Sequence, residues 1–238
     1  MHIDPSIRER KSIQLLNEFP WNTGATIIGG YSVLGYGTLR YSRDLDLVIP
    51  KESSEEIIRW FTLREFSIEK TAKPNPQNYE GSYVRYEKEE VTIDLLVGAV
   101  RDRDAQVDIP AKWIVQGPKF QKIVGLNYST EIEVPLVRME ALWALKLQAG
   151  RSQDISDLYS VFNRKFTHGE VIDLFRSLKC QSLVSKLEMT KQRLHDPQTY
   201  SDIRSRLQFK DNEKNRRDWD RFLSVSEAII DRSCGFSN

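Results

Sequence analysis

The interpretation of this sequence starts from residues 28–47, which read IGGYSVLGYGTLRYSRDLDL. A short run of small and branched residues ends at Gly29 and Gly30, which predicts a buried strand stopping at a tight turn. A short helix is predicted from Tyr31. Glycine lets the backbone approach a ligand closely, and the N–H groups at the start of a helix favour phosphate. The Ser32 hydroxyl could bond a phosphate oxygen in the same place.

The end of this segment places two acids on one side of a strand. Residues 44–50 read DLDLVIP, a strand pattern that Pro50 ends. Alternate residues of a strand face the same side, so Asp44 and Asp46 project together while Leu45 points to the core. Two adjacent carboxylates repel each other unless a cation lies between them, and carboxylate oxygen suits Mg²⁺. The alternative is a solvated strand edge.

The spacing of these residues resembles a known signature. The sequence has no GxGxxG and no GK[ST] motif, which excludes the dinucleotide and Walker-type phosphate loops. An apolar residue, Gly29-Gly30, thirteen further residues and Asp44-Leu45-Asp46 resemble the signature of the DNA polymerase β-like nucleotidyltransferase superfamily. The string RYSRDLD at 40–46 is similar to its AbiEii-type branch. The resemblance implies an α+β nucleotidyltransferase fold, with a mixed sheet flanked by helices and a helical C-terminal domain after it.

The superfamily that the sequence resembles uses a third acid on a neighbouring strand. Asp94 lies in VTIDLLV at 91–97, and an ionised carboxylate among apolar residues is costly unless it is paired or bound to metal. The alternative is a salt bridge to an arginine such as Arg85. The resemblance implies two Mg²⁺ ions, or Mn²⁺, held by Asp44, Asp46 and Asp94, with Asp94 on the ion that activates the attacking hydroxyl.

The nucleotide is expected to contact residues from both halves of the chain. Gly29, Gly30 and Ser32 would hold the triphosphate, and Arg40 would neutralise phosphate charge or be a surface arginine. In the second half, a helix is predicted from Pro135 to Ala149, ended by Gly150. Lys146 lies on its core-facing side, where a lysine either extends to solvent or reaches an anion.

The segment after this helix also resembles the AbiEii-type pattern. AbiEii-type proteins carry a helical lysine followed by an Arg-x-Lys-Asp-x-x-Asp-like string, and RSQDISD at 151–157 is similar to it. Lys146 and Asp154 are therefore expected to contact nucleotide, with Asp157 as an orienting or capping group. The sequence departs from the pattern at Gln153, where a lysine is usual, which puts any catalytic contribution of that position in doubt.

The chain is predicted to form two domains. Residues 1–134 are expected to be the catalytic domain, and residues 135–238 a helical domain that completes the nucleotide cleft. Helices are predicted at 5–18 and from Ser53 to about Leu63, while 101–118 has no clear pattern. Strands are predicted near 66–71, 82–86, 91–98, 121–126 and 131–134.

Composition limits the class of protein. The 238 residues are 39% hydrophobic and 29% charged, as in ordinary globular proteins. Cys180 and Cys234 form no CxxC pair, which favours a reducing cytoplasm and disfavours structural zinc. No secretory signal and no membrane-spanning run is visible. Residues 191–221 hold nine Lys/Arg and six Asp/Glu among three aromatic residues. That pattern favours solvated helices over RNA contact.

The predicted activity is Mg²⁺-dependent transfer of a nucleoside monophosphate (NMP) from a nucleoside triphosphate (NTP) to a hydroxyl acceptor. The resemblance implies tRNA, a protein hydroxyl or a small antibiotic as acceptor, and a toxin with a cognate antitoxin is the preferred subclass. Two alternatives stay open: a catalytically quiet nucleotide-binding or antitoxin-like module, and an aminoglycoside-type antibiotic nucleotidyltransferase. Three retained acids argue against the quiet module, because a binding module does not need so much negative charge.

Overall fold

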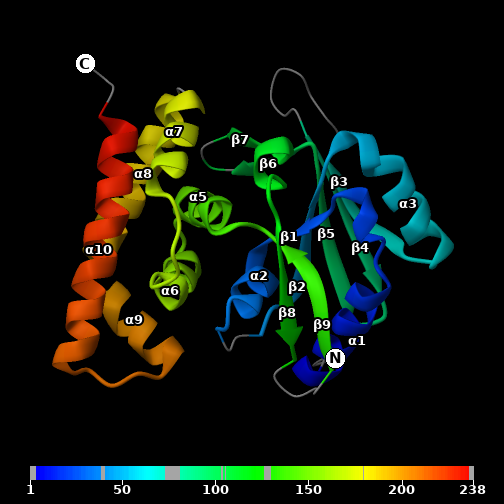
Figure 1. Ribbon diagram of the computed structural model, residues 1–238, viewed down its shortest axis with the longest axis horizontal. Coiled ribbons are helices and arrows are strands. Elements are labelled where there is room, and N and C mark those ends of the chain that lie inside the picture. The colour runs from blue at the N-terminus through cyan, green and yellow to red at the C-terminus, as the bar shows by residue number, and fades with distance from the viewer. Residues whose placement is uncertain are drawn as a thin grey trace. The chain divides into compact units, whose positions relative to one another are not determined.

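The protein folds into two compact units (Figure 1). The structure, a computed structural model, describes residues 4–38, 41–72, 81–102, 104, 106–125, 130–178 and 180–235. The first unit comprises residues 1–101 and 108–138, and the second comprises 102–107 and 139–238. None of the helices in these described ranges combines the length and the apolar character needed to cross a bilayer.

The first unit is a mixed sheet with helices packed on it. Among the residues described, its helices are α1 (Pro5–Glu18), α2 (Gly29–Gly35), α3 (Ser54–Leu63) and α4 (Ala111–Ile114). The seven strands of the sheet, in spatial order, are β3 (Ser67–Ala72), β4 (Ser82–Lys88), β5 (Val91–Val97), β2 (Asp44–Ile49), β1 (Thr26–Ile27), β9 (Glu131–Leu136) and β8 (Lys119–Val124). A separate two-stranded sheet pairs β6 (Ala99–Asp102) with β7 (Val107–Pro110). The predicted mixed sheet flanked by helices is confirmed.

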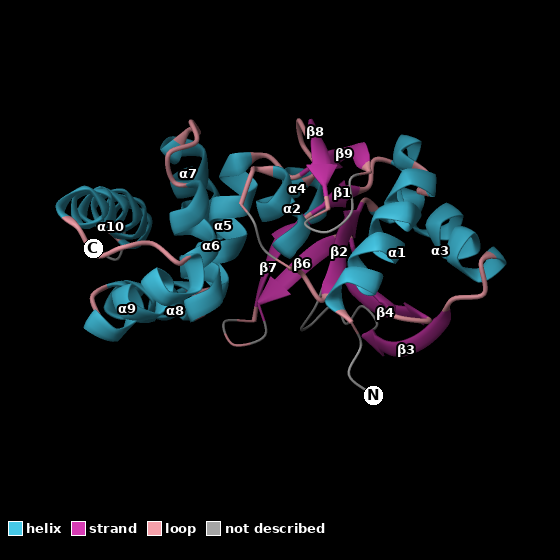
Figure 2. Ribbon diagram, turned by 90° about the horizontal axis from the view of Figure 1, so that it is seen from below, coloured by secondary structure: helices cyan, strands magenta, loops and turns pink. Residues whose placement is uncertain are grey.

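One face of this sheet is apolar and is covered by α1 and α3 (Figure 2). Leu45 on β2, Ile93 on β5 and Tyr86 on β4 lie side by side in register and are almost fully buried. Phe61 of α3 stacks on Tyr86 with ring centroids 4.3 Å apart, and Phe19, just after α1, packs against Phe61. Because side chains alternate along a strand, the residues between these apolar ones must face the other side of the sheet.

The second unit is a bundle of helices. Among the described residues these are α5 (Met139–Ala149), α6 (Ser152–Val161), α7 (His168–Leu178), α8 (Gln181–Leu194), α9 (Pro197–Leu207) and α10 (Glu213–Cys234). Helix α10 packs against α7 and α8, and α6 packs against α5 and α9. Trp143, Tyr159 and Phe222 meet in the core, with ring centroids of neighbouring pairs 5.5–6.0 Å apart. The predicted helical C-terminal part is confirmed.

Several element predictions hold and one is wrong. Helix α1 covers 5–18 as predicted, because Asp4 accepts the Ser6 N–H at 2.9 Å and Pro5 opens the first turn. The helix predicted from Pro135 starts only at Met139. Pro135 belongs to β9, which pairs with β8 on one side and β1 on the other. Residues 101–118, whose sequence shows no clear pattern, contain β7, α4 and the end of β6.

Candidate active site

The two acids of β2 share the polar face of the sheet. Asp44 and Asp46 are each partly exposed, whereas the intervening Leu45 is 1% exposed and Leu47 is fully buried. The alternation predicted from the DLDL string is therefore present. It anchors the strand through its leucines and leaves both carboxylates on the open face.

Asp94 lies next to these acids on the adjacent strand. Strands β2 and β5 run parallel, with Asp46 opposite Asp94 and Asp44 opposite Thr92. Directly opposite residues of neighbouring strands have Cβ atoms roughly 5 Å apart. The fold thus brings the three predicted acids together on one face, although Asp94 follows Asp44 and Asp46 by about fifty residues in the sequence.

Arg85 and Tyr83 hold the Asp94 carboxylate. Arg85 lies opposite Asp94 on β4, and its Nε and Nη2 donate to the two carboxylate oxygens at 2.7 and 2.8 Å. The Tyr83 hydroxyl donates to Oδ1 at 2.8 Å. Burial, together with this bond to Asp94, raises the pKa of Tyr83 to about 12. The salt bridge to Arg85, considered as an alternative for Asp94, is therefore formed.

Negative charge at this face is only partly balanced by Arg85. Burial, and after it the charge of Asp94, raise the pKa of Asp44 despite the opposing effect of Arg85. A group whose carboxylate form is disfavoured in this way gains from a nearby cation. The acids therefore form an electrostatic environment that favours an additional positive charge.

The acids of β2 and β5 can be compared with what Mg²⁺, the cation that the sequence implies, needs from a protein. No group of three or more His, Cys, Asp or Glu side chains arranged to hold a metal ion occurs within the described parts of the chain. Mg²⁺, however, usually binds one or two carboxylates and takes its other ligands from water and substrate phosphates. Asp44 and Asp46 fit that requirement in donor type and in their placement on one face of β2, and a cation at Asp94 would have to exchange a bond with Arg85 or Tyr83.

Gly29 connects the glycine pair to the acids. Its φ is +65°, and a Cβ atom there would lie 1.9 Å from Oδ2 of Asp46. The Ile28 N–H donates to the carbonyl of Asp46 at 3.0 Å, so the start of α2 is fixed against β2. Only glycine satisfies both the left-handed backbone and this close approach. The two halves of the sequence signature are in direct contact.

The other residues predicted at the phosphate site have different surroundings. Gly30 is buried within α2. Ser32 is fully buried, and its hydroxyl donates to the carbonyl of Gly29 at 2.8 Å, which closes the first turn of the helix. Arg40 lies outside the described residues. The phosphate-binding roles of these residues stay predictions.

Lys146 lies in a buried charge network in the second unit. Its ammonium group donates to Asp154 at 2.9 Å and to Asp157 at 2.7 Å, and all three side chains are at most 9% exposed. Arg151 Nε donates to the second oxygen of Asp154 at 2.6 Å. Burial acts to raise the pKa of Asp154, but Lys146 and Arg151 outweigh it and leave that pKa lowered. The network joins α5 to α6, and the nucleotide contact predicted for Lys146 and Asp154 stays a prediction.

Comparison with known families decides the relationship that the motifs suggested. The family model described as nucleotidyl transferase AbiEii toxin, type IV toxin–antitoxin system, matches residues 14–228. The chain belongs to the AbiEii family. That match spans both units, so the helical half is part of the family as well as the sheet. A comparison with curated proteins found no match.

Membership of the AbiEii family confirms the predicted resemblance and sets the general function. The family is one of nucleotidyl transferase toxins of type IV toxin–antitoxin systems. Both the nucleotidyltransferase class and the link to toxin–antitoxin systems were predicted from the GGx₁₃DLD and RYSRDLD strings.

Two side chains of the AbiEii chain complete these clusters but were not predicted. Tyr83 lies two residues before Arg85 on β4, so the period of a strand places both on the same face as Asp94. That periodicity is the signal that would have identified Tyr83. Arg206 of α9 donates to Gln153 Oε1 at 2.7 Å, while Gln153 donates to Asp157 at 3.0 Å. Nothing in the sequence pattern links positions 153 and 206.

Proposed function

We propose that this protein transfers an NMP unit from an NTP to a hydroxyl group of an acceptor, using the acids of β2 and β5 with Mg²⁺. The proposal is supported most directly by the register of Asp46 with Asp94 and by the approach of Gly29 to Asp46. Together these contacts place the acids of β2 and β5 next to the backbone at the start of α2. The family relationship supports the same reaction class.

In the proposed reaction, the acceptor oxygen forms a bond to the α-phosphorus of the NTP. The bond from that phosphorus to the bridging oxygen breaks, pyrophosphate leaves, and the acceptor hydroxyl loses its proton. Asp44 and Asp46 would hold Mg²⁺, with Asp94 as a third ligand after it exchanges a bond with Arg85 or Tyr83. Bound Mg²⁺ would lower the pKa of the hydroxyl and neutralise charge that develops on the phosphates.

The protein residues contribute placement and charge. Arg85 and Tyr83 fix the orientation of the Asp94 carboxylate, which we propose accepts the proton of the acceptor hydroxyl. Gly29 lets the backbone at the start of α2 lie against Asp46, where a larger residue would displace the carboxylate. Oriented groups of this kind reduce the reorganisation needed to reach the transition state.

We further propose that the acceptor is tRNA or a protein hydroxyl and that a cognate antitoxin restrains the activity. The type IV toxin–antitoxin family supports the existence of the antitoxin. The acceptor class rests on the predicted resemblance.

The direct test supplies labelled NTPs, Mg²⁺ and either total RNA or cell lysate to the purified full chain. We expect label to appear in one acceptor fraction and to disappear with Asp46→Ala or on addition of EDTA. Asp173→Ala is the matched control, because Asp173 is an exposed aspartate on α7. Nucleotide binding without transfer, unchanged by Asp46→Ala, would show the catalytically quiet module instead.

A further inference from the structure

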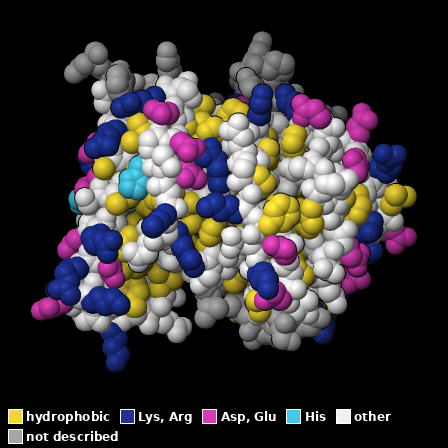
Figure 3. Space-filling view, viewed as in Figure 1, with side chains coloured by type: hydrophobic (Ala, Val, Ile, Leu, Met, Phe, Trp, Pro, Cys, Tyr) yellow, Lys and Arg dark blue, Asp and Glu magenta, His cyan; other side chains and the backbone are white. Residues whose placement is uncertain are grey.

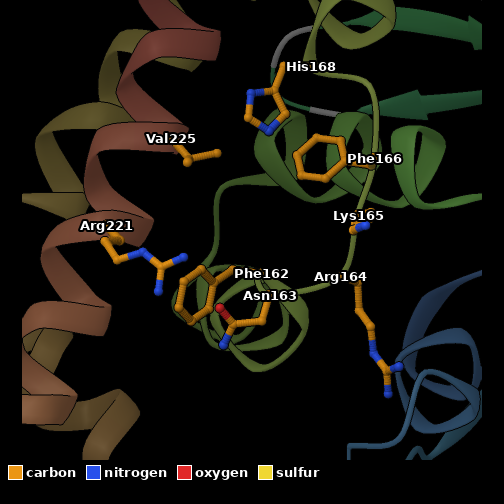
Figure 4. Close-up of a pocket in the computed structure, with 8 residues that line it drawn as sticks. All are labelled: Phe162, Asn163, Arg164, Lys165, Phe166, His168, Arg221 and Val225. Carbon is orange, nitrogen blue, oxygen red and sulfur yellow. The ribbon is translucent and has the colours of Figure 1, made fainter.

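The helical unit contains a pocket whose chemistry is not explained by the proposed reaction. It has a volume of about 370 Å³ and is lined by the end of α6, the loop before α7, the start of α7 and the middle of α10 (Figure 4). This volume is near the lower end of the roughly 300–1,000 Å³ range of ligand pockets. Such a pocket accommodates one planar group with its substituents and is too small for a large ligand.

Aromatic side chains form the walls of this pocket. Phe166 stacks on the buried Trp143 with ring centroids 4.6 Å apart, so one of its faces is supported from inside the unit. The His168 ring lies 4.4 Å from Phe166. Phe162 is held in turn by Tyr159, whose ring lies nearly parallel to it at 5.4 Å. Rings supported from behind and partly open in front are suited to stacking with a planar ligand.

Cationic groups lie at two sides of these rings. The guanidinium of Arg221 on α10 lies over the Phe162 ring, 5.9 Å from its centroid, and Lys165 lies beside Phe166 (Figure 4). Among the described residues that line the pocket there is no aspartate or glutamate. Asp218, which is partly buried, pairs with the exposed Arg221 at 3.5 Å, and an ion pair with one exposed partner near the surface is weak. More Lys and Arg side chains gather over the α9 and α10 end of this unit (Figure 3).

From this arrangement we propose that the pocket binds single-stranded nucleic acid, with a base between Phe162 and Phe166 and the flanking phosphates at Lys165 and Arg221. Stacking platforms inside a cationic groove are the common means of binding single strands without reading their sequence. Positive charge on both sides of the rings fits a ligand with phosphates on both sides of its base. A strand has them, and a mononucleotide has phosphate on one side only.

The aromatic residues of the 191–221 segment do not provide this platform. Tyr200, Phe209 and Trp219 pack against one another with ring centroids 5.4 to 6.1 Å apart. Arg204 and Arg216 of the same segment pair with Asp211. Solvated helices with i,i+4 ion pairs were predicted here: Arg217 and Glu213 form such a pair within α10, whereas Asp211 lies in the loop between α9 and α10. Arg221 is the residue of that segment that lines the pocket.

The test is a fluorescence anisotropy titration of labelled 12-nucleotide RNA and DNA strands with the full chain in EDTA, without NTP. Binding under these conditions does not require transfer, so failure of the proposed reaction leaves this result intact. We expect Lys165→Gln with Arg221→Gln to weaken binding about tenfold or more. Removing one cation that binds a phosphate should reduce the slope of log affinity against log salt by about 0.7.

Two further sets of variants separate stacking from charge. Phe162→Leu and Phe166→Leu should each weaken binding about fivefold or more with an unchanged salt slope, because stacking of one base contributes about 1–3 kcal/mol. Arg59→Gln is the control, since it removes the same charge from an exposed position on α3 outside the pocket. Circular dichroism would verify that each variant is folded.

Three outcomes would overturn the proposal. The first is the absence of strand binding, or binding that the pocket variants leave unchanged. The second is a mononucleotide that competes as well as the 12-nucleotide strand, which would assign the pocket to a free nucleotide. The third is polyglutamate that competes equally well, which would indicate an acidic protein partner.

Discussion

Replacing Gly29 with alanine tests the contact that joins the glycine pair to the acids. The added Cβ would lie 1.9 Å from Asp46 Oδ2, and ordinary contact begins at 3.4 Å, so the carboxylate would have to move by about 1.5 Å. The backbone would also keep its left-handed φ of +65°, which costs a non-glycine residue about 1–2 kcal/mol. Both effects act at the position where the acids are gathered.

The expected magnitudes follow from these two terms. Displacement by about 1 Å from a productive geometry lowers catalysis by roughly 100-fold, and Gly29→Ala should reduce NMP transfer by at least that factor. Overpacking adds about 1–3 kcal/mol to the backbone strain, which gives a total loss of stability of about 2–5 kcal/mol. In an Asp46→Ala background the carboxylate is absent, and the strain of about 1–2 kcal/mol should remain together with the milder contact to the Cβ of residue 46 at 3.1 Å.

The assay is urea denaturation of the wild type, both single variants and the double variant. A coupling energy of about 1–3 kcal/mol between positions 29 and 46 is expected. Gly169→Ala serves as control, because Gly169 has no left-handed φ and a Cβ there would meet no atom within 4 Å. If Gly29→Ala destabilises both backgrounds equally, the clash with Asp46 is not the reason for the glycine.

Three other predictions concern the two charge clusters. Lys146→Met removes the buried cation that Asp154 and Asp157 share and leaves Arg151 as the cation at Asp154, so urea denaturation should show a loss of about 3–5 kcal/mol; an unchanged midpoint would contradict this. Because the pKa of Asp154 is lowered in the folded protein, its stabilisation is complete above the ordinary carboxyl pKa of about 3.9 and is lost as pH falls through the folded value. The stability difference between the wild type and Asp154→Asn should therefore be constant from about pH 5 to 8 and shrink below about pH 4. A difference that widens in acid would contradict the lowered pKa of Asp154. Arg85→Gln should tighten Mn²⁺ binding about thirtyfold in calorimetry, since removing one positive charge at about 4 Å from a divalent ion in water changes the binding free energy by about 2 kcal/mol; weaker binding would exclude competition between Arg85 and the cation for Asp94.

Local patterns predicted the elements that carry the acids. Alternation of Asp and Leu fixes which side of β2 faces the core, and the same alternation in β5 buries Val91, Ile93, Leu95 and Val97 while leaving Asp94 on the other face. Asp94 stood out because it is the acid inside that apolar run. Its pairing with Asp46 in register could be expected from adjacent strands, and the structure has it.

Tertiary contacts decided what the patterns could not. Pro135 is a good first residue of a helix, but residues 131–136 pair with β8 and Leu136 also pairs with Ile27 of β1, which extends the strand past the proline. The partners of Lys146 also could not be predicted from the sequence pattern. Its helix is buried on most sides, so the position of the ammonium depends on α6, which supplies Asp154 and Asp157. A one-element pattern identifies a buried charge but does not identify its partner.

The position of Arg85 explains how so acidic a face can exist in the folded protein. Asp94 is 14% exposed in its side chain and would be costly to bury if nothing compensated its charge. Arg85 and Tyr83 supply that compensation from the chain itself, so the sheet does not need a metal ion in order to form, unlike small domains that fold around zinc. The same bonds mean that a cation must compete for Asp94, while Asp44, whose pKa is raised, still favours added positive charge. In the proposed reaction, affinity for Mg²⁺ should therefore depend on Asp44, Asp46 and the phosphates that arrive with the nucleotide, which would couple metal binding to the presence of substrate.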